Sequence, residues 1–150
     1  TPLWKMFTDQ IKGQPVFPAL KGGTAMVTVE QVAEAAVGAI ENGTHRSTYA
    51  ICGENMTYQK FYEMMVDALG QSDTTIIPVV PYEQLKENYE AIDKNAEENG
   101  TEHGIHMTIS SKLQEEYLYL NPYDTMPILG IKNHDVIKSI KETLKKCVSE

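Results

Sequence analysis

Hydrophobic and polar positions recur along the chain with two different periods, which predict helices and strands in turn. Apolar residues recur at helical spacing in residues 2–13, 30–43, 58–70, 82–99, 110–120 and 134–148. Shorter runs rich in β-branched residues, at 24–29, 47–52 and 74–80, predict strands. Because strands alternate with helices, the sequence predicts an α/β fold, with a short and mostly parallel sheet flanked by helices.

Three of the predicted helices have an apolar stripe that we expect to face the core. In 30–43 it comprises Val32, Ala35, Ala36, Ala39 and Ile40; in 58–70 it comprises Phe61, Met64, Met65, Ala68 and Leu69; in 134–148 it comprises Val136, Ile137, Ile140 and Leu144. Thr28 and Gln31 have the spacing of a capping box, which marks the start of the second helix. The segments 53–55 and 102–110 are expected to be a turn and a loop.

Composition narrows the classes of function. The 150 residues suit one domain, 1–150, and a net charge of −8 disfavours nucleic acid as a partner, since phosphate backbones are bound by clustered cations. No apolar run approaches the length that crosses a membrane. Two cysteines, Cys52 and Cys147, provide neither a disulfide framework nor metal-ligand spacing, so we expect a cytoplasmic protein, with Cys52 as a buried apolar residue.

Tyr82 and Lys86 form a Tyr-x-x-x-Lys pair, a spacing that dehydrogenases use for proton transfer. On one helix face the lysine could lower the pKa of the phenol. The alternative is chance pairing on a charged surface helix, and we favour it because the acidic run from Glu83 to Glu102 is typical of a solvated face. We therefore predict no catalytic residue in this chain.

Two stretches carry a resemblance to a known family. The first stretch matches the family's motifs at Val27, Val29, Val32, Ala33 and Ala36, and then at Tyr49, Ile51, Gly53, Asn55 and Thr57. The second stretch matches the family's closing motifs at Tyr123, Asp124, Leu129, Gly130, Val136, Ile140 and Thr143. This order resembles the C-terminal part of the extended short-chain dehydrogenase/reductase family, in its NAD-dependent epimerase/dehydratase branch. The resemblance implies the substrate-side lobe of a Rossmann-type enzyme.

The resemblance also implies what lies outside these residues. The family's glycine-rich turn, which holds the cofactor pyrophosphate, has no counterpart in the sequence, and its catalytic Tyr-x-x-x-Lys precedes the matched segment. We therefore expect NAD or NADP in the full-length protein and no cofactor bound by this chain. The expected partners are a missing N-terminal half, a small-molecule substrate and, for the full-length protein, a second copy in a homodimer.

Candidate substrate-binding residues follow from the same resemblance. They are Trp4, Phe7 and Phe17, in segments that cover the family's pocket, and Thr28, where many relatives have a pocket-edge histidine. The alternative is that the aromatic residues belong to the core. Thr24 stands where relatives often have a phosphate-binding arginine, so we expect a small carbonyl or hydroxyl compound as substrate, not a nucleotide sugar.

Other polar groups are assigned simpler roles. We interpret Tyr123 and Asp124 as a turn that orders the C-terminus. His103, His106 and Glu102 suggest zinc, but further ligands are missing nearby, so we expect a solvated loop and no metal site.

The leading hypothesis is the substrate-binding part of an NAD(P)-dependent epimerase/dehydratase-type oxidoreductase that is catalytically incomplete by itself. A second hypothesis is the corresponding part of a non-catalytic, NAD(P)-sensing regulator. A third is an autonomous interaction module, which should fold alone as a monomer.

Overall fold

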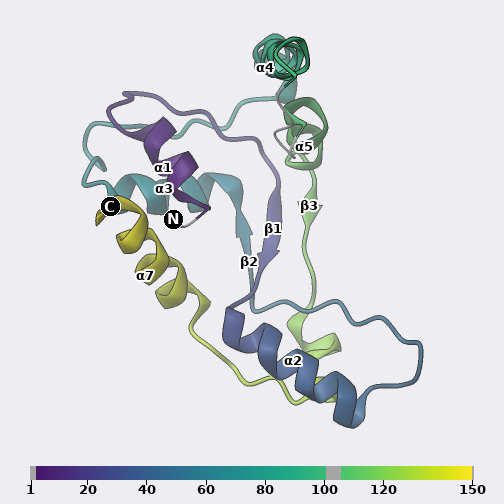
Figure 1. The fold of residues 1–150 in the computed structure, drawn as a ribbon. Helices are drawn as coiled ribbons and strands as arrows, with labels where there is room; N and C mark the ends of the chain where they lie inside the picture. The colour runs from purple at the N-terminus through teal and green to yellow at the C-terminus, as the bar shows by residue number, and fades with distance from the viewer. Residues whose placement is uncertain (1–2, 101–105, 150) are drawn as a thin grey trace.

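The computed structural model describes residues 3–100 and 106–149. In chain order the elements are α1 (Lys5–Ile11), β1 (Gly23–Met26), α2 (Val29–Asn42), β2 (Glu54–Thr57), α3 (Tyr58–Ala68), the 3-10 turn η1 (Tyr82–Gln84), α4 (Lys86–Glu98), α5 (Met107–Leu113), β3 (Tyr117–Leu118), the 3-10 turn η2 (Pro122–Asp124), α6 (Met126–Leu129) and α7 (Val136–Ser149). Figure 1 shows α1, α3 and α7 gathered on one side of the strands, α4 and α5 at one end of them, and α2 at the other.

The sheet differs from the one that the sequence predicts. It has three short strands in the order β2-β1-β3, with β1 antiparallel to β2 and parallel to β3. The expectation of a mostly parallel, Rossmann-type sheet is therefore wrong. The chain returns from α2 into β2 through eleven residues of irregular structure (43–53) and enters the sheet in the opposite direction, so the β1–α2–β2 unit is not a parallel crossover.

Two predicted strands are absent from this sheet. Residues 47–52 form no ladder, and β2 falls on 54–57, where we expected a turn to begin. The side chains of Tyr49 and Ile51 pack instead on a small cluster of Ala35, Leu129 and Ile131. Residues 74–80 make only single parallel bridges, from Ile76 to Val16 and from Val79 to Ala19.

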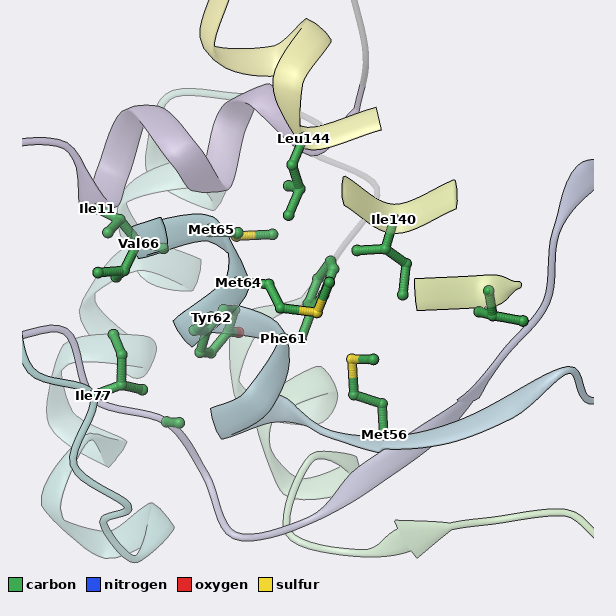
Figure 2. Packing of buried hydrophobic residues seen from close by; sticks show 12 residues of the cluster. Ile11, Met56, Phe61, Tyr62, Met64, Met65, Val66, Ile77, Ile140 and Leu144 are labelled. Carbon is green, nitrogen blue, oxygen red and sulfur yellow. The ribbon is translucent and has the colours of Figure 1, made fainter. Parts of the chain in front are cut away.

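The main core lies between α3, α7 and the sheet. Figure 2 shows Phe61, Met64 and Met65 of α3 pointing toward Ile140 and Leu144 of α7, with Met56 of β2 beneath them. Val136 is also buried, while Ile137, Ala68 and Leu69 pack against the cluster from its edge. The predicted inward faces of these two helices are thus confirmed.

The predicted inward face of α2 is wrong except for Ala35. The buried residues of this helix are Gln31, Ala35 and Gly38, whereas Val32, Ala36, Ala39 and Ile40 are exposed. A Cβ at position 38 would collide with the Leu129 carbonyl of α6, so α6 can approach α2 only because residue 38 is glycine. Backbone contact through small residues, not burial of the largest ones, sets the rotation of α2.

The region around α4 and α5 also departs from the predictions. Tyr82 is buried in η1 and stacks on Tyr89, with 6.3 Å between the ring centroids. Lys86 is the first residue of α4, so Tyr82 and Lys86 do not share one helix, contrary to the prediction. The segment expected to be a loop up to residue 110 contains the start of α5. That helix ends at Leu113, and the predicted helix over 110–120 gives way to β3. No helix within the described residues is both long and apolar enough to cross a membrane.

Candidate functional site

A cavity of about 300 Å³ lies between the turn from β1 into α2 and the side of α7. Its lining comprises Trp4, Met26, Val27, Thr28, Val29, Glu30, Val136, Ser139, Ile140, Glu142, Thr143 and Lys146. The volume is at the lower end of the range typical of small-molecule sites.

Thr28 is held at the cavity wall by the capping box that the sequence predicts. Its hydroxyl oxygen accepts a hydrogen bond from Gln31 N at 3.1 Å, and Gln31 Oε1 accepts one from Thr28 N at 3.0 Å. Within the described residues no acceptor takes the Thr28 hydroxyl proton. The Thr28 hydroxyl therefore keeps a donor proton that the described residues do not use.

Gly53 allows three segments to meet behind this wall. A Cβ on residue 53 would collide with Gln31 Oε1 and with Cγ2 of Val136, and its backbone N–H donates to Met26 O at 2.8 Å. Gln31 Nε2 is buried here and has no hydrogen-bond partner among the described residues. The close approach fixes the first residues of α2 and α7 relative to the end of β1.

The floor of the cavity is apolar. Val136 and Ile140 of α7 are buried, and Trp4 packs edge-on against Phe61 with ring centroids 4.8 Å apart. Because Phe61 belongs to the main core, the indole of Trp4 has a fixed support. A ligand would thus meet a rigid apolar surface on one side and the Thr28 hydroxyl on another.

Polar groups from α7 and α2 surround the opening. The hydroxyl of Ser139 donates to the backbone carbonyl of Asp135, just before α7, at 3.2 Å, and the hydroxyl of Thr143 donates to Ser139 O at 2.9 Å; both oxygens can still accept. Glu30, Glu142 and Lys146 are exposed. The described residues that line the cavity include the ionisable side chains of Glu30, Glu142 and Lys146, together with the hydroxyls of Thr28, Ser139 and Thr143.

Comparison with known proteins yields a likeness of fold. The chain is similar to the crystal structure of gox2253, with a TM-score of 0.61 and 19% identity over 96% of this chain. It spans 42% of the length of that chain. No family model matches the sequence. No curated protein matches it either.

The structure brings two of the four predicted substrate-binding residues together. Trp4 and Thr28 line the cavity from different elements. Phe7 and Phe17 do not reach it and pack around Tyr62, with ring centroids 6.5 Å and 5.3 Å from its ring. Burial raises the pKa of Tyr62, as expected for a phenol enclosed by apolar side chains.

The remaining predicted positions lie away from the cavity. Tyr123 and Asp124 form the η2 turn, where Asn121 Nδ2 donates to Asp124 Oδ1 at 2.9 Å. Cys52 is buried as predicted, although outside any strand, and burial raises the pKa of its thiol. Glu102 and His103 lie outside the described residues, and His106 is the residue directly before α5, where its side chain makes no capping hydrogen bond.

Sequence reasoning missed the contribution of α7 to the site. Ser139, Thr143 and Lys146 recur at helical spacing, which is a signal of a common face, but a polar helix face is usually solvated. The signal that could have located them is their position beside Val136 and Ile140, which places a polar strip directly next to the core strip.

Proposed function

We propose that these residues form the substrate-binding part of an NAD(P)-dependent oxidoreductase of the epimerase/dehydratase type, catalytically incomplete on its own. The observation that carries the proposal is the cavity in which Thr28 and Trp4 meet. The sequence resemblance assigns Thr28 to a pocket edge, and the geometry gives it an available donor.

The chemistry of the lining supports a particular class of substrate. An apolar floor with one hydroxyl donor favours a small molecule that has a carbonyl or hydroxyl oxygen at one end and a hydrocarbon body. Thr24, which replaces the arginine of many relatives, lies in β1 next to Tyr58 and supplies no guanidinium for a phosphate. A compact carbonyl compound therefore fits better than a nucleotide sugar.

The second half of the proposal, that the chain is catalytically incomplete, rests on the sequence resemblance, in which the glycine-rich turn has no counterpart here and the catalytic Tyr-x-x-x-Lys precedes the matched segment. Hydride transfer to a carbonyl carbon needs a nicotinamide and an acid that protonates the carbonyl oxygen. In this proposal both come from the part of the protein that precedes these residues. The likeness to 42% of a longer chain agrees with such an arrangement.

The test uses the isolated chain and the full-length gene product together. We expect no saturable NADH binding by the chain, measured by fluorescence titration, and NADH-dependent reduction of small carbonyl compounds by the full-length protein. Binding of NADH by the chain alone would overturn the proposal. Binding without turnover by the full-length protein would support the sensor hypothesis instead.

Two substitutions connect the activity to the cavity. Ser139→Leu adds bulk to the lining from a partly exposed helix position, and we expect KM for the carbonyl substrate to rise by about tenfold or more with the NADH affinity unchanged. Thr28→Ser keeps both the cap and the hydroxyl and serves as the matched control. Unchanged KM in Ser139→Leu would exclude this cavity as the substrate site.

A further inference from the structure

The side of α2 that faces away from α6 is a continuous apolar surface. It comprises Val29, Val32, Ala33, Ala36, Val37, Ala39 and Ile40, which we call the outer face of α2. At 100° per residue the centre of this face lies opposite the buried Gln31, Ala35 and Gly38, and Val32 and Ala39 lie at the edge nearer to Ala35. Val29 is 77% exposed and Ile40 86% exposed, the opposite of what large aliphatic side chains favour.

Charged residues are confined to one flank of this helix. Glu30, Glu34 and Glu41 follow one another along that flank, and none lies on the outer face. Glu34 is already engaged, because its carboxylate accepts from Lys132 N at 2.8 Å and lies 3.2 Å from His134 Nε2. The outer face thus has an acidic border on one side and no charge within it.

This composition is typical of an interaction surface. Contiguous apolar patches on soluble proteins mark interaction sites. Obligate interfaces are the most apolar ones and resemble the hydrophobic core of a domain. Ala33, Ala36 and Ala39 are small, so a neighbouring backbone can approach the helix closely. Four of its residues, Val32, Ala36, Ala39 and Ile40, were expected to face the core on periodicity alone, which agrees with a surface made to be buried.

We propose that the outer face of α2 is the surface on which the rest of a longer protein packs, namely the part that carries the cofactor under the proposed function. In gox2253 the elements similar to this chain account for 42% of one chain, so a fold of this kind occurs inside a single chain more than twice as long. This likeness favours a covalently linked occupant over a second copy. The proposal rests on the proposed function for the identity of that occupant.

The position of the outer face relative to the cavity supports the same occupant. Val29 belongs to both, since it lines the cavity and begins the outer face. A body seated on α2 would therefore reach the mouth of the cavity beside Thr28. A cofactor carried by that body could then meet a substrate held against Trp4. We expect the packed surface to be apolar, with basic residues opposite Glu30 and Glu41.

Thiol labelling tests the proposal directly. Cys52 and Cys147 are buried, so a cysteine introduced by Ile40→Cys provides the fast-reacting thiol. We expect rapid reaction with a maleimide in the isolated chain and a rate at least about tenfold lower in the full-length protein. Glu90→Cys on the exposed side of α4 is the control and should react quickly in both.

A charge substitution provides a second, independent readout. Ile40→Glu should leave the melting temperature of the isolated chain unchanged and lower that of the full-length protein. Ile109→Glu, at a position on α5 that is 62% exposed, is the matched control and should change neither. Loss of stability of the isolated chain in Ile40→Glu would mean that the residue is part of its core and would overturn the proposal.

The outcomes separate this proposal from the proposed function. Equal labelling rates in the chain and in a full-length protein that binds NADH would overturn the docking surface alone. Protection of Ile40→Cys in a full-length protein that binds no NADH would overturn the proposed function and leave the surface supported. Protection that grows with the concentration of the isolated chain, together with a dimer in sedimentation, would assign the face to a second copy and overturn the proposal.

Discussion

The side chain of Asp93 in α4 receives two hydrogen bonds from Thr108 in α5, one from the backbone N–H at 2.9 Å and one from the hydroxyl at 2.6 Å. Met107 N donates a third at 2.7 Å. Asp93 therefore caps the start of a helix that lies after it in the chain. These bonds lower the pKa of Asp93 from 3.8 to about 2, and the hydrogen bonds from Thr108 are the largest cause.

The first prediction follows from this cap. A carboxylate whose pKa is lower in the folded state stabilises the fold above its unfolded value of 3.8, and loses that effect as the pH falls through about 2. Asp93→Asn should therefore lower the melting temperature at pH 6, and the difference from the unsubstituted protein should shrink as the pH approaches 2. Melting curves by circular dichroism across this range provide the test. A difference independent of pH would refute the assignment.

A second prediction concerns Asn55, which ties β2 to the end of β3. Its Nδ2 donates to Leu120 O at 2.8 Å, and its Oδ1 accepts from Leu120 N at 3.1 Å. Asn55→Ala removes both bonds, together with the weak bond that Cys52 Sγ donates to Asn55 Oδ1 at 3.4 Å, and should reduce the free energy of unfolding by about 1–2 kcal/mol in urea titration. Asn88→Ala, at an exposed position of α4, is the control and should not reduce it. Equal effects of the two substitutions would contradict the role of Asn55.

A third prediction uses the contact between α2 and α6. Gly38→Ala would improve helix propensity, yet its methyl group would meet the Leu129 carbonyl. We expect the contact to dominate and the stability to fall by about 1–3 kcal/mol. Val37→Ala, at the neighbouring exposed position, should leave the stability of the isolated chain unchanged or raise it. A stabilising Gly38→Ala would show that α6 does not pack so closely.

A fourth prediction compares two leucines. Leu144 of α7 is fully buried in the main core, whereas Leu118 of β3 is 48% exposed. Leu144→Ala should reduce the free energy of unfolding by about 2–5 kcal/mol, because it removes buried surface and leaves a cavity. Leu118→Ala, the same chemical change, should reduce it by at most about 1 kcal/mol. Similar losses would indicate that Leu118 is covered in solution.

The helices were predictable wherever one apolar face meets the core. Phe61 and Met65 in α3, and Ile140 and Leu144 in α7, have large side chains at helical spacing, and the core contains them. In α2 the same reasoning selected Val32 and Ile40, yet close contact of Gly38 with α6 decides which side is buried. An analysis of periodicity searches for helix faces that are rich in large apolar side chains. It therefore cannot detect a helix contact, such as that of Gly38 with α6, that requires a glycine.

The strands were harder to predict because their partners are distant in the sequence. Residues 47–52 have the composition of a strand, but Tyr49 and Ile51 pack on the cluster around Leu129. At the candidate site, Thr28 could be found from the capping box and the family resemblance. Thr143 could not, because only the packing of α7 beside the β1–α2 turn places it there.

The position of β1 between β2 and β3 has a consequence for the order of folding. Gly23 pairs with Thr57, which follows it within a few dozen residues, and also with Tyr117, which is made much later. On the ribosome, β1 can therefore acquire its antiparallel neighbour early but must wait for most of the chain before the parallel one exists. Since distant pairings close slowly, we expect docking of β3 to be among the last steps in reaching the native state.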